Sequence, residues 1–312
     1  MKQMKLLLVP LIFLLLFSCD LSLDERKPTI RIITVASDYI GIEAGDLECC
    51  INDQKAMKEQ LEHLSLHSGY EFDGIHITYS NGEIYSIRST NDSSSEFQKR
   101  ITSPYSDLSR KPMRETIEAA FDALSKGSNN EDITIFYYTG HGAHGNEYPW
   151  LERGTLFFEN NSEDGIHVHE LYEMLSQING KKLLLIDSCY SGAFVYDDIY
   201  MPGTLKDALN LLFVTPGFEN DDIWMLSASS EDEESKTGHT YSLFTDSLLE
   251  ALGYDTENGA VGFPESDDVY FSEIYDYVKA NTDTIQHPQS ERTIRDMRLF
   301  SIITRPLRSY RD

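Results

Sequence analysis

Residues 183–192 read LLLIDSCYSG, an apolar run that stops abruptly at polar and small residues. Residues 133–142 repeat this pattern as ITIFYYTGHG. Neither run alternates apolar with polar residues, so both predict strands that are buried on both faces of a parallel sheet. In such sheets functional sites form beyond the carboxyl ends of the strands. We therefore expect His141 and Cys189, which follow the two strand ends, to lie at the same edge.

These two side chains provide a nucleophile and a base. A thiolate is the attacking species, and a neighbouring imidazole both lowers the thiol pKa and later protonates the leaving amine. A cysteine within a strand would be an inert hydrophobic residue, but Cys189 follows the strand end, just before a Ser-Gly turn. His144 lies in the same glycine-rich segment and is the alternative base. The pattern predicts a cysteine hydrolase.

Two further segments extend the pattern. Residues 47–53 read LECCIND, and residues 286–289 read QHPQ. Together with YYTGHG and DSCYSG, they resemble the caspase-like cysteine peptidases, and among those the metacaspases. The first segment resembles the Cys-x-Asn-Asp run that opens the first helix of a metacaspase. The second is similar to a Gln-x-Pro turn before the last strand. The resemblance spans about residues 30–304, and Cys49 stands where the family more often has Gly.

The resemblance implies an α/β fold, a caspase-like sandwich with a mostly parallel central sheet and helices on both faces. It implies a cysteine-type endopeptidase with a two-residue catalytic dyad. Cys189 would be the nucleophile, and His141 the base, because the family's base directly follows the glycine that ends the strand. The amides of Gly142 and Cys189 would stabilise the oxyanion.

Two carboxylates predict the substrate specificity. Asp187 stands two residues before Cys189, so its side chain points to the same side of an extended chain. Asp53 resembles the second acidic residue of the metacaspase S1 pocket. A pair of carboxylates favours a guanidinium or ammonium group, which predicts cleavage after Arg or Lys. The alternatives are a helix N-cap for Asp53 and a turn residue for Asp187. The acidic run at residues 231–234 either borders this pocket or is a solvated loop.

The first residues predict export and lipidation. Residues 1–18 form a signal peptide with a basic start and an apolar middle, and they end before Cys19 in a sequence that resembles a bacterial lipobox. Residues 19–29 are a tether, and residues 30–312 are the peptidase domain. We expect lipidation at Cys19, a membrane anchor in the bacterial cell envelope, and a catalytic domain outside the cytoplasm. An ordinary secretory peptide or an uncleaved anchor is the alternative.

The charge of the chain limits its partners. The 52 acidic residues exceed the 26 basic ones, giving a net charge of −26. Such a chain repels phosphate backbones, so we expect a polypeptide substrate and no nucleic acid. The chemistry requires no cofactor. Some metacaspases are activated by calcium, and acidic residues flank the nucleophile strand here, although their spacing matches no defined calcium loop. These residues are Glu159, Glu163, Asp164, Asp197 and Asp198.

Other classes of protein remain open at this point. The four histidines at 141, 144, 167 and 169 suggest a metal-dependent hydrolase, although this leaves Cys189 unexplained. A caspase-like protein that binds a partner without cleaving it is another alternative. Among cysteine hydrolases, a legumain-like enzyme would prefer Asn at P1, and a clostripain-like enzyme would prefer Arg alone. We expect the adjacent Cys49 and Cys50 to pack in the core, because neighbouring cysteines form a strained disulfide. The sequence does not determine the oligomeric state.

Periodicity and turn residues predict the order of the elements. A loop is expected at 90–111, and a helix beginning at Asn52 or Asp53. The remaining expected strands are 30–36, 75–79, 84–87, 133–138, 183–186, 223–227 and 297–303, and the remaining helices are 113–124, 168–178, 241–252 and 271–280.

Overall fold

The chain folds around one eight-stranded sheet with the order β11-β9-β8-β5-β1-β2-β3-β4. The computed structural model describes residues 26–40, 46–91, 97–102, 112–143, 155–158, 165–195, 222–282, 284–290 and 296–303. The strands of the sheet are β1 (Thr29–Ser37), β2 (Glu71–Ser80), β3 (Glu83–Thr90), β4 (Phe97–Thr102), β5 (Ile133–Thr139), β8 (Lys181–Asp187), β9 (Ile223–Ser227) and β11 (Gln289–Ser290). Strands β2, β1, β5, β8 and β9 are parallel, and β3, β4 and β11 run antiparallel to their neighbours.

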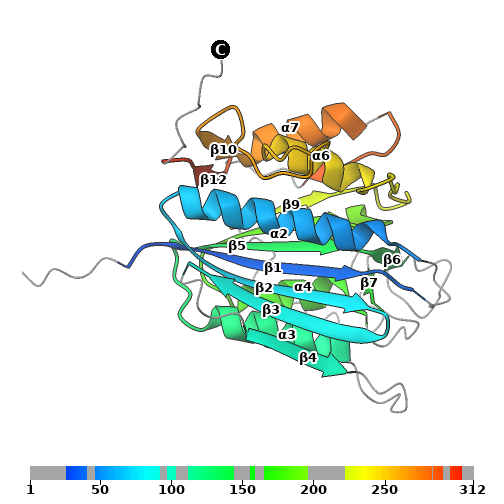
Figure 1. Ribbon diagram of the computed structural model, residues 1–312, viewed down its shortest axis with the longest axis horizontal. Helices are drawn as coiled ribbons and strands as arrows, with labels where there is room; N and C mark the ends of the chain where they lie inside the picture. The colour runs from blue at the N-terminus through cyan, green and yellow to red at the C-terminus, as the bar shows by residue number, and fades with distance from the viewer. Residues whose placement is uncertain are drawn as a thin grey trace, which may run out of the picture.

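Helices cover both faces of this sheet (Figure 1). Helix α2 (Cys49–His67) packs on β1, and α6 (Leu243–Ala251) and α7 (Phe271–Thr282) join it in one hydrophobic core. Helices α3 (Pro112–Ser125) and α4 (Val168–Ser176) build the second core on the opposite face. The predicted α/β architecture, a mostly parallel sheet with helices on both faces, is thus confirmed.

The apolar runs explain the two cores. Every residue of β1 and β5 is buried. Because successive side chains of a strand point to opposite faces, Ile30 and Ile32 enter the core with α2, whereas Ile33 and Val35 enter the core with α3. Strands with one polar face could not supply both cores, so these runs specify a sheet covered on both sides.

In the described part of the chain, four short strands and a 3-10 turn lie outside the main sheet. Strands β6 (His141–Ala143) and β7 (Thr155–Phe157) form an antiparallel pair, and a 3-10 turn covers Ser191–Phe194. Strand β10 (Asp268–Tyr270) pairs with β12 (Arg298–Ser301). The strand expected at 297–303 therefore forms, but in a separate two-stranded ribbon.

Two sequence predictions of local structure were wrong. The segment expected as a loop contains β4, which pairs with β3 at the sheet edge. Helix α2 begins at Cys49, with Glu48 as its N-cap residue, so neither Asn52 nor Asp53 caps it. Both corrections have a tertiary cause: a polar edge strand is stabilised by its neighbour, and Asp53 is held by residues far away in the sequence. The expected Asn81-Gly82 hairpin does form, with positive φ at both residues.

The predicted membrane anchor lies outside the described residues, because residues 1–25 contain both the signal peptide and Cys19. Within the described part of the chain, no helix combines the length and the apolar character needed to cross a bilayer. The domain boundaries expected at residues 18 and 29 stay predictions.

Candidate active site

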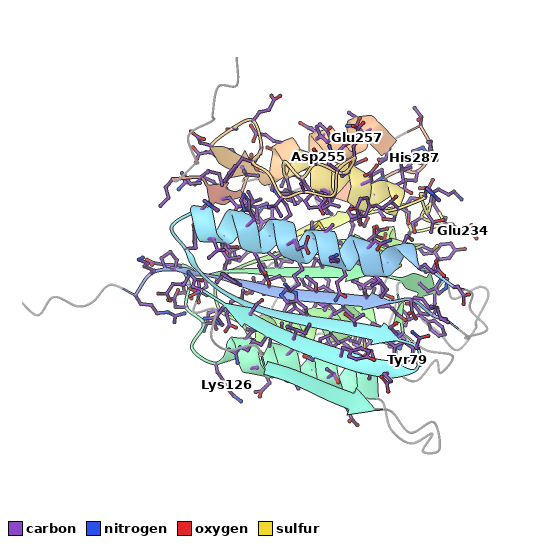
Figure 2. All side chains as sticks on the ribbon, in the orientation of Figure 1. Tyr79, Lys126, Glu234, Asp255, Glu257 and His287 are labelled. Carbon is purple, nitrogen blue, oxygen red and sulfur yellow. The ribbon has the colours of Figure 1, made fainter. Side chains whose placement is uncertain are left out.

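Strands β5 and β8 are parallel neighbours that end side by side at one edge of the sheet. Thr139 and Asp187 are partners in the parallel register, and the Gly140 amide donates to the Asp187 carbonyl at 3.1 Å. Strand β6 begins immediately afterwards at His141. Figure 2 shows Glu234 and His287 near this end of the molecule, and Lys126 at the opposite end.

The segment that carries His141 touches the segment that carries Cys189. An added Cβ on Gly142 would lie 2.0 Å from the Cys189 carbonyl oxygen and 2.8 Å from the Ser188 Oγ. The two backbones are therefore in contact, and only a glycine permits this approach. His141 precedes the contacting glycine, and Cys189 supplies the contacted carbonyl, at the shared edge of the sheet.

The thiol of Cys189 is partly buried among acidic groups. Its Sγ lies 3.8 Å from the Ser235 Oγ. Burial raises the pKa of the Cys189 thiol, and the charges of Glu234 and Asp187 raise that pKa further. These surroundings disfavour a resting thiolate, so a base has to take the proton of the Cys189 thiol during the attack.

The turn after the nucleophile strand is fixed by the acidic run at 231–234. Tyr190 adopts a positive φ of 58° and donates its amide to the Glu233 carbonyl at 2.7 Å. The Glu233 carboxylate in turn accepts bonds from the amides of Ser230 and His287. An added Cβ on Gly192 would lie 2.5 Å from the Glu231 amide nitrogen. This run therefore packs against the turn instead of only being solvated.

Tyr39 holds the backbone at His141, and no sequence signal singled it out. Its hydroxyl accepts the His141 amide at 2.9 Å and donates to the carbonyl of Phe157. Its ring centroid lies 4.3 Å from that of the imidazole. Tyr39 is fully buried just after the end of β1, with φ of 55°. Only the pairing of β1 with β5 brings it to His141, about a hundred residues later in the chain.

Asp53 and Asp187 form a buried acidic pair. Their exposed fractions are 0% and 3%, and no ion pair to either carboxylate occurs among the described residues. Asp53 accepts bonds from the Thr139 hydroxyl at 3.1 Å and the Ser242 amide at 3.0 Å. Asp187 accepts bonds from the hydroxyls of Ser242 and Thr245. Burial raises the pKa of Asp53 well above its ordinary value and that of Asp187 to about 6.

A protein-family model of the caspase domain matches residues 33–297. The chain belongs to the caspase-domain family. It is therefore a cysteine-type peptidase with a polypeptide substrate. Among solved structures, it is similar to caspase-1 from Spodoptera frugiperda, with 12% sequence identity and a TM-score of 0.49. That comparison covers 86% of this chain and 88% of the other. A search of curated proteins found no match.

The histidines that the sequence suggested as metal ligands do not form a metal site among the described residues of this caspase-domain chain. The His167 ring bonds the Thr155 hydroxyl at 2.8 Å and takes part in a capping box at the start of α4. His169 stacks on His167. His144 lies outside the described residues, as do the five acidic residues considered for calcium. Among the residues described, the one group of three metal-type ligands contains no histidine.

Replacing Gly142 with Ala tests the contact at the centre of the site. The added Cβ has to displace the backbone of Cys189, so we expect a loss of about 1–3 kcal/mol in unfolding free energy, as for other overpacked sites. Peptidase activity should fall by more than about 100-fold, because a shift of about 1 Å at reacting groups has that effect. Urea denaturation and peptide hydrolysis measure the two effects.

The control for this variant is Gly127→Ala. Gly127 has a positive φ of 79°, which an Ala adopts only with strain, but an added Cβ there would meet nothing within 4 Å. Its substitution should cost about 1 kcal/mol of stability while leaving activity within about twofold. Equal activity losses in the two variants would show that the contact at Gly142 is not specific to the site.

Replacing Asp187 with Asn tests the electrostatic cost of the acidic pair. Because folding raises the pKa of Asp187, its favourable contribution is complete below pH 3.8 and is lost as pH rises through about 6. The charge is opposed by Asp53 and Cys49 from α2 and by Cys189, and Tyr137 of β5 lies beside it.

We therefore expect the unfolding free energy of the native chain to fall between about pH 4 and pH 7. In the Asp187→Asn variant, which keeps an acceptor oxygen, the decrease in unfolding free energy over this pH range should be smaller by about 1–3 kcal/mol. Urea titrations at the two pH values measure it. An unchanged pH dependence in the variant would mean that Asp187 is ionised at no cost.

Proposed function

We propose that this caspase-domain peptidase cleaves polypeptides after Arg or Lys, with Cys189 as nucleophile and His141 as general base. The observation that carries the proposal is the buried acidic pair of Asp53 and Asp187, formed next to the strand ends that precede the two reactive side chains. A peptidase of this family needs a nucleophile and a place for the P1 side chain, and this edge of the sheet brings candidates for both together.

The proposed chemistry follows the ordinary course of acyl transfer. His141 takes the thiol proton as the Cys189 sulfur bonds to the peptide carbonyl carbon, and the amides of Gly142 and Cys189 donate to the oxyanion. His141 then gives the proton to the leaving amine as the C–N bond breaks. Water, deprotonated by His141, attacks the thioester and releases the acid and the thiol. The raised pKa of Cys189 supports proton transfer during the attack rather than a preformed ion pair.

The acidic pair supports a basic P1 residue on electrostatic grounds. Two carboxylates in a desolvated pocket attract a guanidinium or ammonium strongly, because the surrounding dielectric constant is low. They repel the side chain of Asp or Glu for the same reason. A bound cation would also relieve the repulsion between the carboxylates, so part of the binding energy comes from a strain already present in the free protein.

Tyr39 supports the proposal as a positioning residue, and Tyr39→Phe tests it. Removing the hydroxyl leaves the His141 amide without its acceptor, which should cost about 1–3 kcal/mol of stability. We expect kcat to fall about tenfold with little change in KM, because the base moves while the pocket does not. The control is Tyr79→Phe, in another fully buried tyrosine at the end of β2. A change in KM alone would contradict the assignment.

A fluorogenic peptide library with every P1 residue, run with and without calcium, tests the proposed function. Arg and Lys peptides should be cleaved fastest, and iodoacetamide should abolish cleavage. Fastest cleavage after Asp would refute the acidic pocket, and cleavage after Asn alone would indicate a legumain-like enzyme. Sensitivity to a chelator but not to iodoacetamide would favour the metal-dependent hydrolase. Binding of peptides without cleavage would favour the non-cleaving alternative.

Three further proposals depend on the sequence alone. The chain is lipidated at Cys19, is held in the bacterial cell envelope with its catalytic domain outside the cytoplasm, and needs no cofactor for its chemistry, with calcium as a candidate activator. Metabolic labelling with palmitate, compared between the native chain and Cys19→Ser, tests the first. Membrane fractionation of the same two chains tests the second, and the calcium arm of the library tests the third.

A further inference from the structure

Two thiols and a carboxylate lie together at the start of α2, next to the proposed P1 pocket. We propose that Cys49, Cys50 and Asp53 bind a thiophilic divalent cation such as Zn²⁺, and that the bound ion excludes the P1 side chain. The binding site stands independently of the peptidase mechanism, whereas the exclusion of substrate rests on the proposed function.

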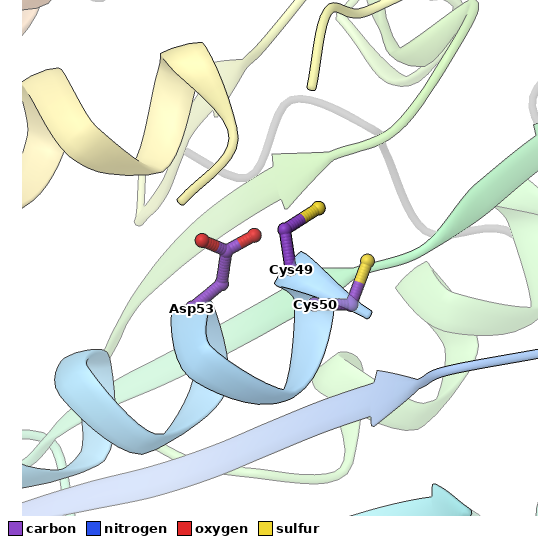
Figure 3. Close-up of side chains that lie close together, drawn as sticks. All are labelled: Cys49, Cys50 and Asp53. Atoms are coloured by element: carbon purple, nitrogen blue, oxygen red, sulfur yellow. The ribbon is translucent and has the colours of Figure 1, made fainter. Parts of the chain in front are cut away.

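The geometry fits a small tetrahedral ion. The two Sγ atoms and a carboxylate oxygen of Asp53 all lie within 4.8 Å of one another. In a tetrahedral zinc site, with Zn–S of about 2.3 Å and Zn–O of about 2.0 Å, ligand atoms are about 3.3–3.8 Å apart. Figure 3 shows the three side chains projecting from the first two turns of α2 toward the same region. Small side-chain rotations would close the set and leave a fourth position for water.

Burial gives these ligands a reason to bind a cation. Cys50 and Asp53 are 3% and 0% exposed, and the Asp187 carboxylate opposes the charge on both Cys49 and Asp53. A buried charge ordinarily has a cationic partner or coordinates a metal, and a metal ion bound here would take the place of the protons on these ligands. In the part of the chain that the structure describes, this cluster has no cationic side chain as a partner.

The ligand types select the metal. Two sulfur ligands favour zinc and similar soft ions, whereas calcium and magnesium require oxygen ligands in greater number. The proposed site is therefore distinct from the acidic loops considered for calcium activation. It also gives Cys49 and Cys50 a role beyond core packing.

The same contacts make metal and substrate competitors. Asp53 shares Ser242 with Asp187, because the Ser242 amide bonds Asp53 and the Ser242 hydroxyl bonds Asp187. An ion on Asp53 would neutralise one of the two carboxylates and place a positive charge where a P1 guanidinium would bind. Zn²⁺ should therefore raise KM for a substrate with P1 Arg.

Binding is tested in a chain whose only thiols are the proposed ligands. The protein has four cysteines, so the Cys19→Ser, Cys189→Ala chain retains only Cys49 and Cys50. Titration with Co²⁺ should give one ion per chain with thiolate-to-cobalt absorption in the near ultraviolet, and Zn²⁺ should displace the Co²⁺. Adding Cys49→Ser to this background should weaken binding at least tenfold, and Asp53→Asn should weaken it as well. Thermal denaturation monitors the folding of each variant.

Lack of cobalt–thiolate absorption in the background chain, or full binding in folded Cys49→Ser, would overturn the site. Protection of Cys49 and Cys50 from alkylation by Zn²⁺ is a second measure, independent of those variants, and its absence would overturn the site too. The substrate arm measures KM for an Arg peptide with Zn²⁺ in the native chain and in Cys49→Ala. Inhibition that is equal in both would mean that Zn²⁺ acts at Cys189 and His141 instead. Cobalt binding in the background chain, together with no cleavage of Arg or Lys peptides by the native chain, would refute the proposed function and leave the metal site intact.

Discussion

Replacing Cys189 with Ala, His141 with Ala, or both should reduce kcat/KM for an Arg peptide by nearly the same factor. We expect about 10⁴-fold or more in each case, because residues that act as a unit are far from additive. Without the sulfur no acyl-enzyme forms, and without the imidazole the thiol, whose pKa is raised by burial, keeps its proton. Continuous fluorescence assays at saturating and limiting peptide measure the effect.

The control for this cycle is Ser235→Ala. The Ser235 hydroxyl oxygen lies 3.8 Å from the Cys189 sulfur, but the proposed chemistry gives it no proton to transfer. Its removal should change kcat/KM by less than about tenfold, the effect of one weak hydrogen bond. If the losses from Cys189→Ala and His141→Ala multiplied in the double variant, the two residues would act independently and the dyad would be wrong.

Neutralising the acidic pair should remove the preference for basic P1 residues. Asp187→Asn and Asp53→Asn should each lower kcat/KM for an Arg peptide by about 30-fold to 1,000-fold, because truncating one partner of a buried charge pair costs about 2–4 kcal/mol. A peptide with P1 norleucine should change by less than about tenfold. The ratio of the two kcat/KM values is the decisive measurement, since a general folding defect would lower both alike.

Glu234→Gln is the matched control for charge near the nucleophile. Glu234 belongs to the acidic run, raises the pKa of Cys189, and is exposed. Water screens exposed charges, so we expect less than about fivefold change in the ratio for Arg over norleucine. If Glu234→Gln changed this ratio as much as Asp187→Asn, the acidic run would be the specificity determinant in place of the buried pair.

Local sequence determined the elements that depend on local chemistry. The apolar runs at 133–138 and 183–186 specified strands buried on both faces, and the polar and small residues after them placed His141 and Cys189 at the strand ends. The Asn81-Gly82 pair specified a hairpin, because positive φ suits these residues. In each case the local structure depends on residues that are neighbours in the sequence.

The tertiary structure decided everything that depends on partners distant in the sequence. The sequence left Asp53 as either an acidic pocket residue or a helix cap, whereas in the structure it lies inside the helix, where Thr139 and Ser242 hold it beside Asp187. No feature of the sequence marked Tyr39 as part of the site. Only the pairing of β1 with β5 places its hydroxyl within hydrogen-bond distance of the His141 amide. The polar strand β4 formed at the edge only because β3 supplies its hydrogen bonds. Periodicity records which face of an element is buried, but long-range hydrogen bonds between polar side chains leave no periodic trace, and these bonds shape the site.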